Sequence, residues 1–151
     1  MKSAFIATLI GVLLLEGCCS ACRQRTRHAR PLEETTWHLV QIEGRDIAAD
    51  EGTYDIRLSG GSLTGTVVCN HMMGNYTLGD AFSIRFGATA STKMFCPNEE
   101  LEPRLAAVLE TATHYDIDYD MLMLLQDGAI KAVFKAVEPK GQQRRSVPAG
   151  G

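Results

Sequence analysis

The stretch "TYDIRLSGGSLTGTVVCN" (Thr53–Asn70) indicates the fold class of this 151-residue chain. Its first half alternates strictly, because Tyr54, Ile56 and Leu58 are separated by polar residues, as in a strand with one buried face. A Gly-Gly pair follows at 60–61, and such a pair favours the tight turn of a β-hairpin. The second half is rich in β-branched residues and returns as the next strand. The stretch therefore predicts two antiparallel strands joined by a short turn.

Strand patterns continue on both sides of this hairpin, with turn residues between them. The expected strands are 36–42, 81–86, one continuous strand over 115–126, and 129–137. In the segment 81–86, Phe82, Ile84 and Phe86 are expected to point inward. The segment "GNYTL" (74–78) is expected to lead into the turn at Gly79 and Asp80. Met72 and Met73 lie in "NHMMGNY", where a loop is expected to cap the core. Short strands at this regular spacing are typical of an antiparallel meander.

One helix is expected among the strands, over residues 99–112. Apolar residues recur there at the spacing of a single helical face, namely Leu101, Leu105, Val108, Leu109 and Ala112. Asn98 would cap the helix, and Pro103 must lie in its first turn. Seven or so strands and one helix cannot cover a flat open sheet. The predicted fold class is α+β and mainly antiparallel β, with a sheet curled into a partial barrel and one packed helix.

Residues 1–17 have the pattern of a signal peptide, a positive start followed by a short apolar core. The core is shorter than the roughly 20 apolar residues that a membrane-spanning helix needs. It ends in "LEGC" (Leu15–Cys18), which is similar to a bacterial lipobox, although the acidic Glu16 departs from that pattern. Cys18 is therefore the expected lipid attachment site of a lipoprotein signal peptide, with ordinary cleavage near Ala21 as the alternative.

A lipid anchor predicts a place in the bacterial cell envelope, on the outer membrane facing the periplasm. Residues 18–31 are then a basic tether, residues 32–138 the folded domain and residues 139–151 a disordered tail. The segment 31–138 holds 7 Lys and Arg against 17 Asp and Glu, a net charge of −10. A nucleic acid is excluded as a partner, because the phosphate backbone requires a basic face on the folded part.

Cys69 and Cys96 are the only cysteines of the folded segment. In an exported chain two such thiols usually pair, and a disulfide here would close a loop of about 28 residues and stabilise the fold by about 3.5 kcal/mol. One alternative is a zinc site of Cys69, His71 and Cys96 with His38 or His114, but the spacing of paired metal ligands is missing. The other is a nucleophile formed by Cys69 and His71. The chain has no hydrolase, phosphate-loop or dinucleotide motif. We therefore expect no catalytic residue, no metal and no cofactor.

Several motifs resemble those of the META domain, the HslJ-like family of small bacterial envelope proteins. They are "TWHLVQIEG" (Thr36–Gly44), "GTVVCNHMMGNY" (Gly65–Tyr76), "STKMFC" (Ser91–Cys96), and the helical sequence that starts at Leu101. One departure is Val68, where the family often has glycine. The resemblance covers roughly residues 32–137 and implies a barrel-like β structure with one helix. It also implies a secreted or lipid-anchored protein, in some members linked to heat shock or stress, without an established enzymatic activity.

The combined expectation is a non-enzymatic envelope lipoprotein that acts as a stress-related interaction or protective module at the membrane surface. Its partners would be the membrane, through the lipid anchor, and an envelope protein. The alternative is a carrier that holds a small ligand in a pocket of the curled sheet. Large inward side chains that meet in the middle of the sheet would leave little room for such a ligand.

Overall fold

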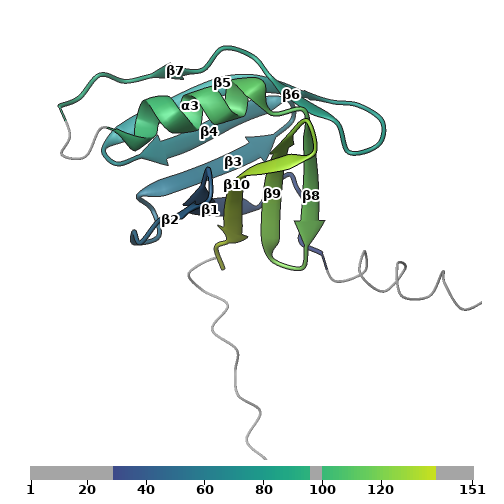
Figure 1. The fold of residues 1–151 in the computed structure, drawn as a ribbon. Coiled ribbons are helices and arrows are strands. Elements are labelled where there is room, and N and C mark those ends of the chain that lie inside the picture. The colour runs from purple at the N-terminus through teal and green to yellow at the C-terminus, as the bar shows by residue number, and fades with distance from the viewer. Residues whose placement is uncertain (1–28, 96–99, 139–151) are drawn as a thin grey trace, which may run out of the picture.

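The computed structural model describes residues 29–95 and 100–138, which form one curled antiparallel sheet with a helix against it (Figure 1). The strands are β1 (Thr36–Ile42), β2 (Arg45–Asp46), β3 (Tyr54–Ser59), β4 (Ser62–Val67), β5 (Asn70–Leu78), β6 (Ile84–Phe86), β7 (Ala90–Ser91), β8 (His114–Asp118), β9 (Met121–Gln126) and β10 (Ala129–Ala136). The helix is α3 (Leu101–Thr111). The sequence predicted seven or so strands, and the described residues contain ten, because β2 and β7 are only two residues long.

The sheet closes almost completely on itself. Its strands follow the order β6-β5-β4-β3-β1-β10-β9-β8, with β2 paired to β1 and β7 paired to β5. The two ends of this order meet, because the Ile84 N–H donates to the Thr113 carbonyl at 3.0 Å and the Tyr115 N–H donates to the Phe82 carbonyl at 2.9 Å. A nearly closed curl leaves few unpaired strand edges. The predicted fold class is therefore confirmed.

The β3–β4 hairpin has the form that the sequence predicted. Its strands pair without a bulge from Tyr54–Val67 to Ser59–Ser62. Tyr54, Ile56 and Leu58 are buried and the intervening side chains face outward. Gly60 and Gly61 both have positive φ, +53° and +82°, which is the backbone that a tight hairpin turn requires at its two central positions.

Large side chains fill the interior of the curl. The fully buried ones include Trp37, Phe134, Leu39, Ile42, Ile56, Leu58, Leu63, Ile84, Leu105, Leu109 and Leu122. They come from the whole circuit of the sheet and from α3. One end of the barrel is covered by the segment before β1, where Leu32 is buried and its carbonyl accepts the indole N–H of Trp37 at 2.9 Å. Burial of side chains of this size contributes about 1.5–3 kcal/mol each.

The helix α3 begins at Leu101 and ends at Thr111, slightly inside the predicted range of 99–112. Leu105, Val108 and Leu109 form its buried face, as the apolar spacing predicted. Pro103 lies in the first turn, where the missing N–H has no helical acceptor to lose. The N-cap is Glu100, without a side-chain capping bond, and the prediction of Asn98 as the cap is therefore wrong.

The segment "NHMMGNY" is strand and not the predicted loop. It makes up most of β5, the longest strand at nine residues, which pairs with β4 on one edge and with β6 and β7 on the other. Met72 is 2% exposed inside the core, whereas Met73 is 54% exposed on the outer face. Local polarity predicted a loop, but strand pairing on both edges overrides that weak preference.

Phe82 does not point inward as predicted, and it is 61% exposed. Ala81 and Phe82 both have positive φ, so the turn consumes them and β6 begins only at Ile84. The alternation of the sequence therefore holds for Ile84 and Phe86 but not for the residue before them. The Phe82 ring instead packs edge-on against Tyr115, with 5.7 Å between ring centroids.

The predicted continuous strand over 115–126 is two strands. Strand β8 ends at Asp118, Tyr119 adopts a φ of +54°, and β9 begins at Met121 and runs back along β8. Apolar residues stand at every second position from Tyr115 to Leu125, so the sequence pattern itself shows no break. The reversal changes which residues face inward, because Leu122 and Leu124 are buried after the turn.

Candidate functional site: a groove built around Asn70

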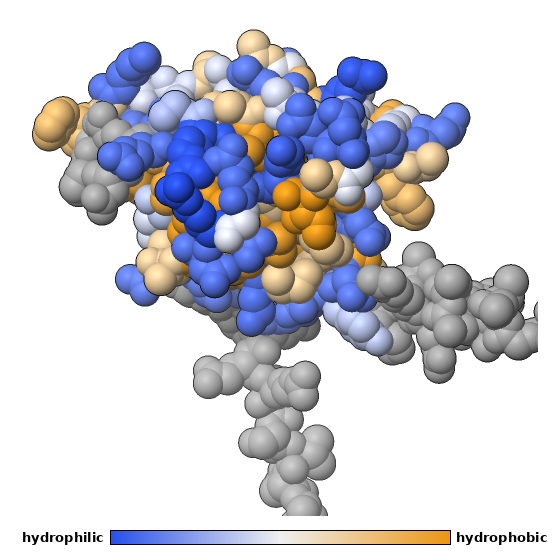
Figure 2. Space-filling model, viewed as in Figure 1, coloured by the Kyte–Doolittle hydropathy of each residue, from blue (hydrophilic) through white to orange (hydrophobic). Residues whose placement is uncertain are grey.

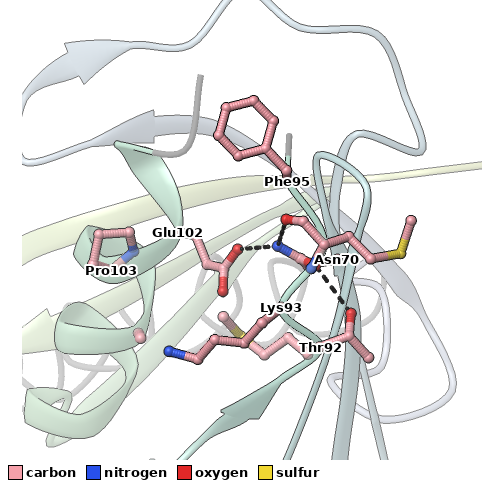
Figure 3. A pocket seen from close by; sticks show the side chains of 9 residues that line it. Asn70, Thr92, Lys93, Phe95, Glu102 and Pro103 are labelled. Carbon is pink, nitrogen blue, oxygen red and sulfur yellow. Dashed lines mark hydrogen bonds between the residues drawn. The ribbon is translucent and has the colours of Figure 1, made fainter. Parts of the chain in front are cut away.

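Asn70 is the first residue of β5 and one of the few buried polar side chains, with 4% of its surface exposed. It follows the turn at Val68 and Cys69, in which Val68 adopts a φ of +58°. A family glycine would fit this backbone without strain, so Val68 makes the turn costlier than glycine would. The turn directs the Asn70 side chain toward the start of α3 and the segment after β7 (Figure 3).

The Asn70 amide connects three segments that are far apart in the chain. Its Oδ1 accepts the Met94 backbone N–H at 2.8 Å and the Thr92 hydroxyl at 3.1 Å. Its Nδ2 donates to Glu102 Oε2 at 2.8 Å (Figure 3). An amide is the side chain that can both accept and donate in this way, and a carboxylate here would face Glu102 without a donor. Asn70 therefore holds the segment 92–94 and α3 in a fixed relation to β5.

The Thr92 side chain completes this connection. The Thr92 N–H donates to the His71 carbonyl at 3.0 Å, and the Thr92 hydroxyl oxygen accepts the His71 N–H at the same distance. Thr92 thus extends the short pairing of β7 with β5 by one residue, although it lies outside the strand. The motifs "CN" and "STKM", which are distant in the sequence, meet at this network.

A groove of about 440 Å³ lies beside Asn70, between β5, the segment after β7 and the first turns of α3. Met72 lines it from the sheet, and Pro103 and Ala106 line it from the helix. Met94 and Phe95 stand on its rim, 56% and 98% exposed. Two exposed apolar side chains beside an open groove, with Lys93 and Glu102 as its charged groups, suit recognition of another molecule better than core packing.

His38 and Asp55 form a second polar pair, which the sequence did not reveal. The His38 Nδ1 atom lies 2.6 Å from Asp55 Oδ1, and its Nε2 atom lies 3.2 Å from the Ala49 carbonyl. His38 is 6% exposed, because the loop after β2 covers this part of the outer face. Asp55 Oδ2 also accepts the Gly52 N–H at 3.0 Å. All these atoms are occupied within the fold, so the pair ties the loop to the sheet.

The residues that the sequence singled out are placed as follows. Cys18 and Cys96 lie outside the described residues. Cys69 lies in the turn before Asn70 and is not a free thiol, and its pairing with Cys96 stays a prediction. His71 and Met73 lie on the outer face of β5, opposite to the buried Met72. Within residues 29–95 and 100–138, no three His, Cys, Asp or Glu side chains are grouped as metal ligands.

Ionisable groups beyond both ends of β1 have shifted pKa values, and so does Tyr76 of β5. Hydrogen bonds from Ser59 and Arg57 lower the pKa of Glu34, and a hydrogen bond from Arg104 lowers the pKa of Glu43. Burial, together with the hydrogen bond that Tyr76 donates to Glu33, raises the pKa of the Tyr76 hydroxyl. These shifts arise from structural contacts outside the groove.

No helix in the described part of the chain is long and apolar enough to cross a bilayer.

Comparison with solved structures reveals the same fold in other bacterial proteins. An NMR structure of a protein from Burkholderia xenovorans matches with a TM-score of 0.58 and 22% identity, over 72% of this chain and 85% of that chain. A DUF4847 family protein from Bacteroides vulgatus matches with a TM-score of 0.53 and 16% identity, over 72% of this chain and 95% of that chain. At these identities the similarity concerns the fold alone.

Comparison with families is more specific. No curated protein matches the chain. The family model of the META domain matches residues 30–138, which include both the "CN" and "STKM" motifs that meet at Asn70. The chain belongs to the META domain family.

Proposed function

We propose that this chain is a non-enzymatic envelope lipoprotein whose META domain serves as an interaction or protective module at the membrane surface during stress. The observation that carries the proposal is the groove at Asn70. Its frame is fixed by hydrogen bonds, whereas its rim presents the almost fully exposed Phe95 and the half-exposed Met94. A fixed frame with exposed apolar anchors is the usual build of a protein-binding site.

The carrier alternative receives less support. A carrier of this fold would hold its ligand inside the curl, and there Trp37, Leu39 and Phe134 are fully buried against one another and their neighbours. The groove at Asn70 lies at the surface, where its open side suits a protruding side chain of a protein partner. A protein partner is therefore the leading proposal, and a small ligand is the second.

The anchor rests on the sequence "LEGC" at the end of a short apolar segment. Globomycin, which blocks lipoprotein signal processing, should cause the precursor to accumulate, and Cys18→Ser should release the protein from membranes. A Cys18→Ser protein that stays in the membrane fraction would contradict the anchor.

The groove is tested by crosslinking in intact envelopes. A photoreactive amino acid at Phe95 should capture a defined partner, which mass spectrometry then identifies. The matched control carries the same amino acid at Leu78, an exposed apolar residue 45% accessible at the other end of β5. Equal capture from both positions would show that the groove has no special role. Dependence on stress is measured by comparing the crosslinking yield at Phe95 before and after heat shock.

A further inference from the structure

Strand β9 is apolar on both of its faces. Its sequence is "MLMLLQ", and Leu122 and Leu124 are fully buried in the core. Met121, Met123 and Leu125 alternate with them and therefore face outward, where they are half-buried and lie outside the core cluster. A strand of an antiparallel sheet with one solvated face normally alternates between apolar and polar residues, whereas apolar residues on both faces are typical of a strand covered on both sides.

The strands on either side of β9 carry opposite charges in register with its outer face. Asp118 of β8 pairs with Met121, which pairs with Lys135 of β10. The next outward row is Asp116, Met123 and Val133, and the third is His114, Leu125 and Ile130. Ile130 is 49% exposed. Figure 2 shows an apolar area over this side of the sheet, bordered by hydrophilic surface.

We propose that this face, formed by the outward side chains of β8, β9 and β10, binds a second copy of the chain. A two-fold axis parallel to β9 would stack the two β9 strands on each other, with Met123 against its own counterpart. The same rotation places β8 over β10 of the second copy, so Asp118 faces Lys135 in both halves of the interface. An isologous interface requires such self-complementarity, in which one residue contacts a second and the second contacts the first.

The charge pattern also excludes the other simple arrangements. An axis perpendicular to the strands in the plane of the face would lay β8 over β8 and β10 over β10 of the second copy, so Asp118 would not reach Lys135, and with the axis on the Met123 row Asp116 would face its own counterpart. An anionic membrane surface would be repelled by the same two carboxylates. A second copy turned about the strand direction is the occupant that pairs Asp118 with Lys135 and stacks the apolar outer side chains of β9 on each other, while Asp116 lies over Val133 at the edge of the face.

The arrangement agrees with the place where the N-terminal segment joins the domain. The Arg30 N–H donates to the Tyr119 carbonyl at 2.8 Å, so this segment meets the domain at the β8–β9 turn. Rotation about an axis parallel to β9 keeps the two N-terminal segments at the same end of the dimer. Two chains anchored in one membrane need their N-terminal segments at the same end, a point that rests on the proposed lipid anchor. Confinement to one membrane would also raise the effective concentration of the second copy.

The test uses full-length chains with two different C-terminal tags, expressed together in the native envelope. Each carries a photoreactive amino acid at position 123, and the yield of crosslinked dimers that contain both tags is measured. The charge swaps Asp118→Lys and Lys135→Asp are made in separate chains. Each swap alone should lower the yield about tenfold, because a like-charge contact replaces both ion pairs.

Mixing the two swaps distinguishes an interface from a folding defect. When one tagged chain carries Asp118→Lys and the other carries Lys135→Asp, every charge again faces its opposite, and the mixed dimer should recover to within about twofold of wild type. The control places the photoreactive amino acid at Thr64, on the outer face of β4, and should give little dimer. The proposal would be overturned if wild-type chains gave no crosslinked dimers, or if the mixed chains did not recover the wild-type yield. Neither result depends on which partner is captured at Phe95.

Discussion

The β3–β4 and β8–β9 hairpins are both antiparallel strand pairs, but the side chains on their outer faces differ in polarity. The first presents Asp55, Arg57, Thr64 and Thr66 outward, and Asp55 and Arg57 make bonds to groups of the same domain. The second presents methionine and leucine on β9. Both hairpins bury apolar side chains on their inner faces, so the fold needs nothing apolar on the outside of either one. The difference agrees with the proposed contact between the outer face of β9 and a second copy of the chain.

The largest expected effect separates the two faces of β9. Leu122→Ala should destabilise the domain by about 2–5 kcal/mol, because it leaves a cavity in a filled core. Met123→Ala on the neighbouring outer position should change the unfolding free energy by less than about 1 kcal/mol. Denaturant unfolding of both variants checks the pair. Equal losses would mean that the outer face also supports the fold, and the comparison between the hairpins would fail.

The second prediction concerns the turn that follows the β3–β4 hairpin. A Cys69–Cys96 disulfide closing about 28 residues should contribute about 3.5 kcal/mol. Reduction should then lower the unfolding temperature by several degrees, since each kcal/mol shifts a domain of this size by about 3–6 °C. Intact mass with and without alkylation, without reductant, provides the direct measurement. Two alkylated thiols in the folded body would contradict the bridge and make zinc binding the next property to measure.

The third prediction tests whether Asn70 holds the groove as a unit. Asn70→Asp should cost about 1–3 kcal/mol, because the carboxylate loses the donor to Glu102 and faces a like charge. Asn70→Asp combined with Glu102→Gln should recover most of that loss, since the glutamine amide can donate in the reverse direction. Chemical unfolding of the single and double variants measures the coupling. No recovery in the double variant would show that the loss arises elsewhere.

The smallest expected effect concerns the polar outer face of the first hairpin. Hydrogen bonds from Ser59 and Arg57 lower the folded-state pKa of Glu34, so folding favours the ionised carboxylate. Its contribution is present above the ordinary glutamate pKa and is lost as the pH falls through the lower folded value. The contribution is small because these side chains are exposed. The difference in unfolding free energy between wild type and Glu34→Gln should therefore shrink as the pH is lowered from about 6 to about 3. A difference that grows as the pH falls would show that the pKa of Glu34 is raised and not lowered.

Much of the architecture was predictable because it depends on local patterns. The alternation of Tyr54, Ile56 and Leu58, the Gly-Gly turn and the apolar face of α3 all report side-chain direction over a few residues. The motifs "CN" and "STKM" identified the family, but their contact could not be derived from spacing. Asn70 lies 22, 24 and 32 residues from Thr92, Met94 and Glu102, and only the folded chain brings these groups together.

The amino-acid pattern alone was therefore enough to predict most strands, the helix and the burial of most of their apolar faces. Where strands stop, and which faces meet, depends on the packing of the whole domain. Phe82 and Tyr119 fall on unbroken alternating patterns, yet both adopt positive φ in turns, because the chain must reverse there to pair β6 with β5 and β9 with β8. Periodicity is a property of a few neighbouring residues, whereas pairing is settled by segments that meet across the whole sheet, and the position of a turn follows from the pairing.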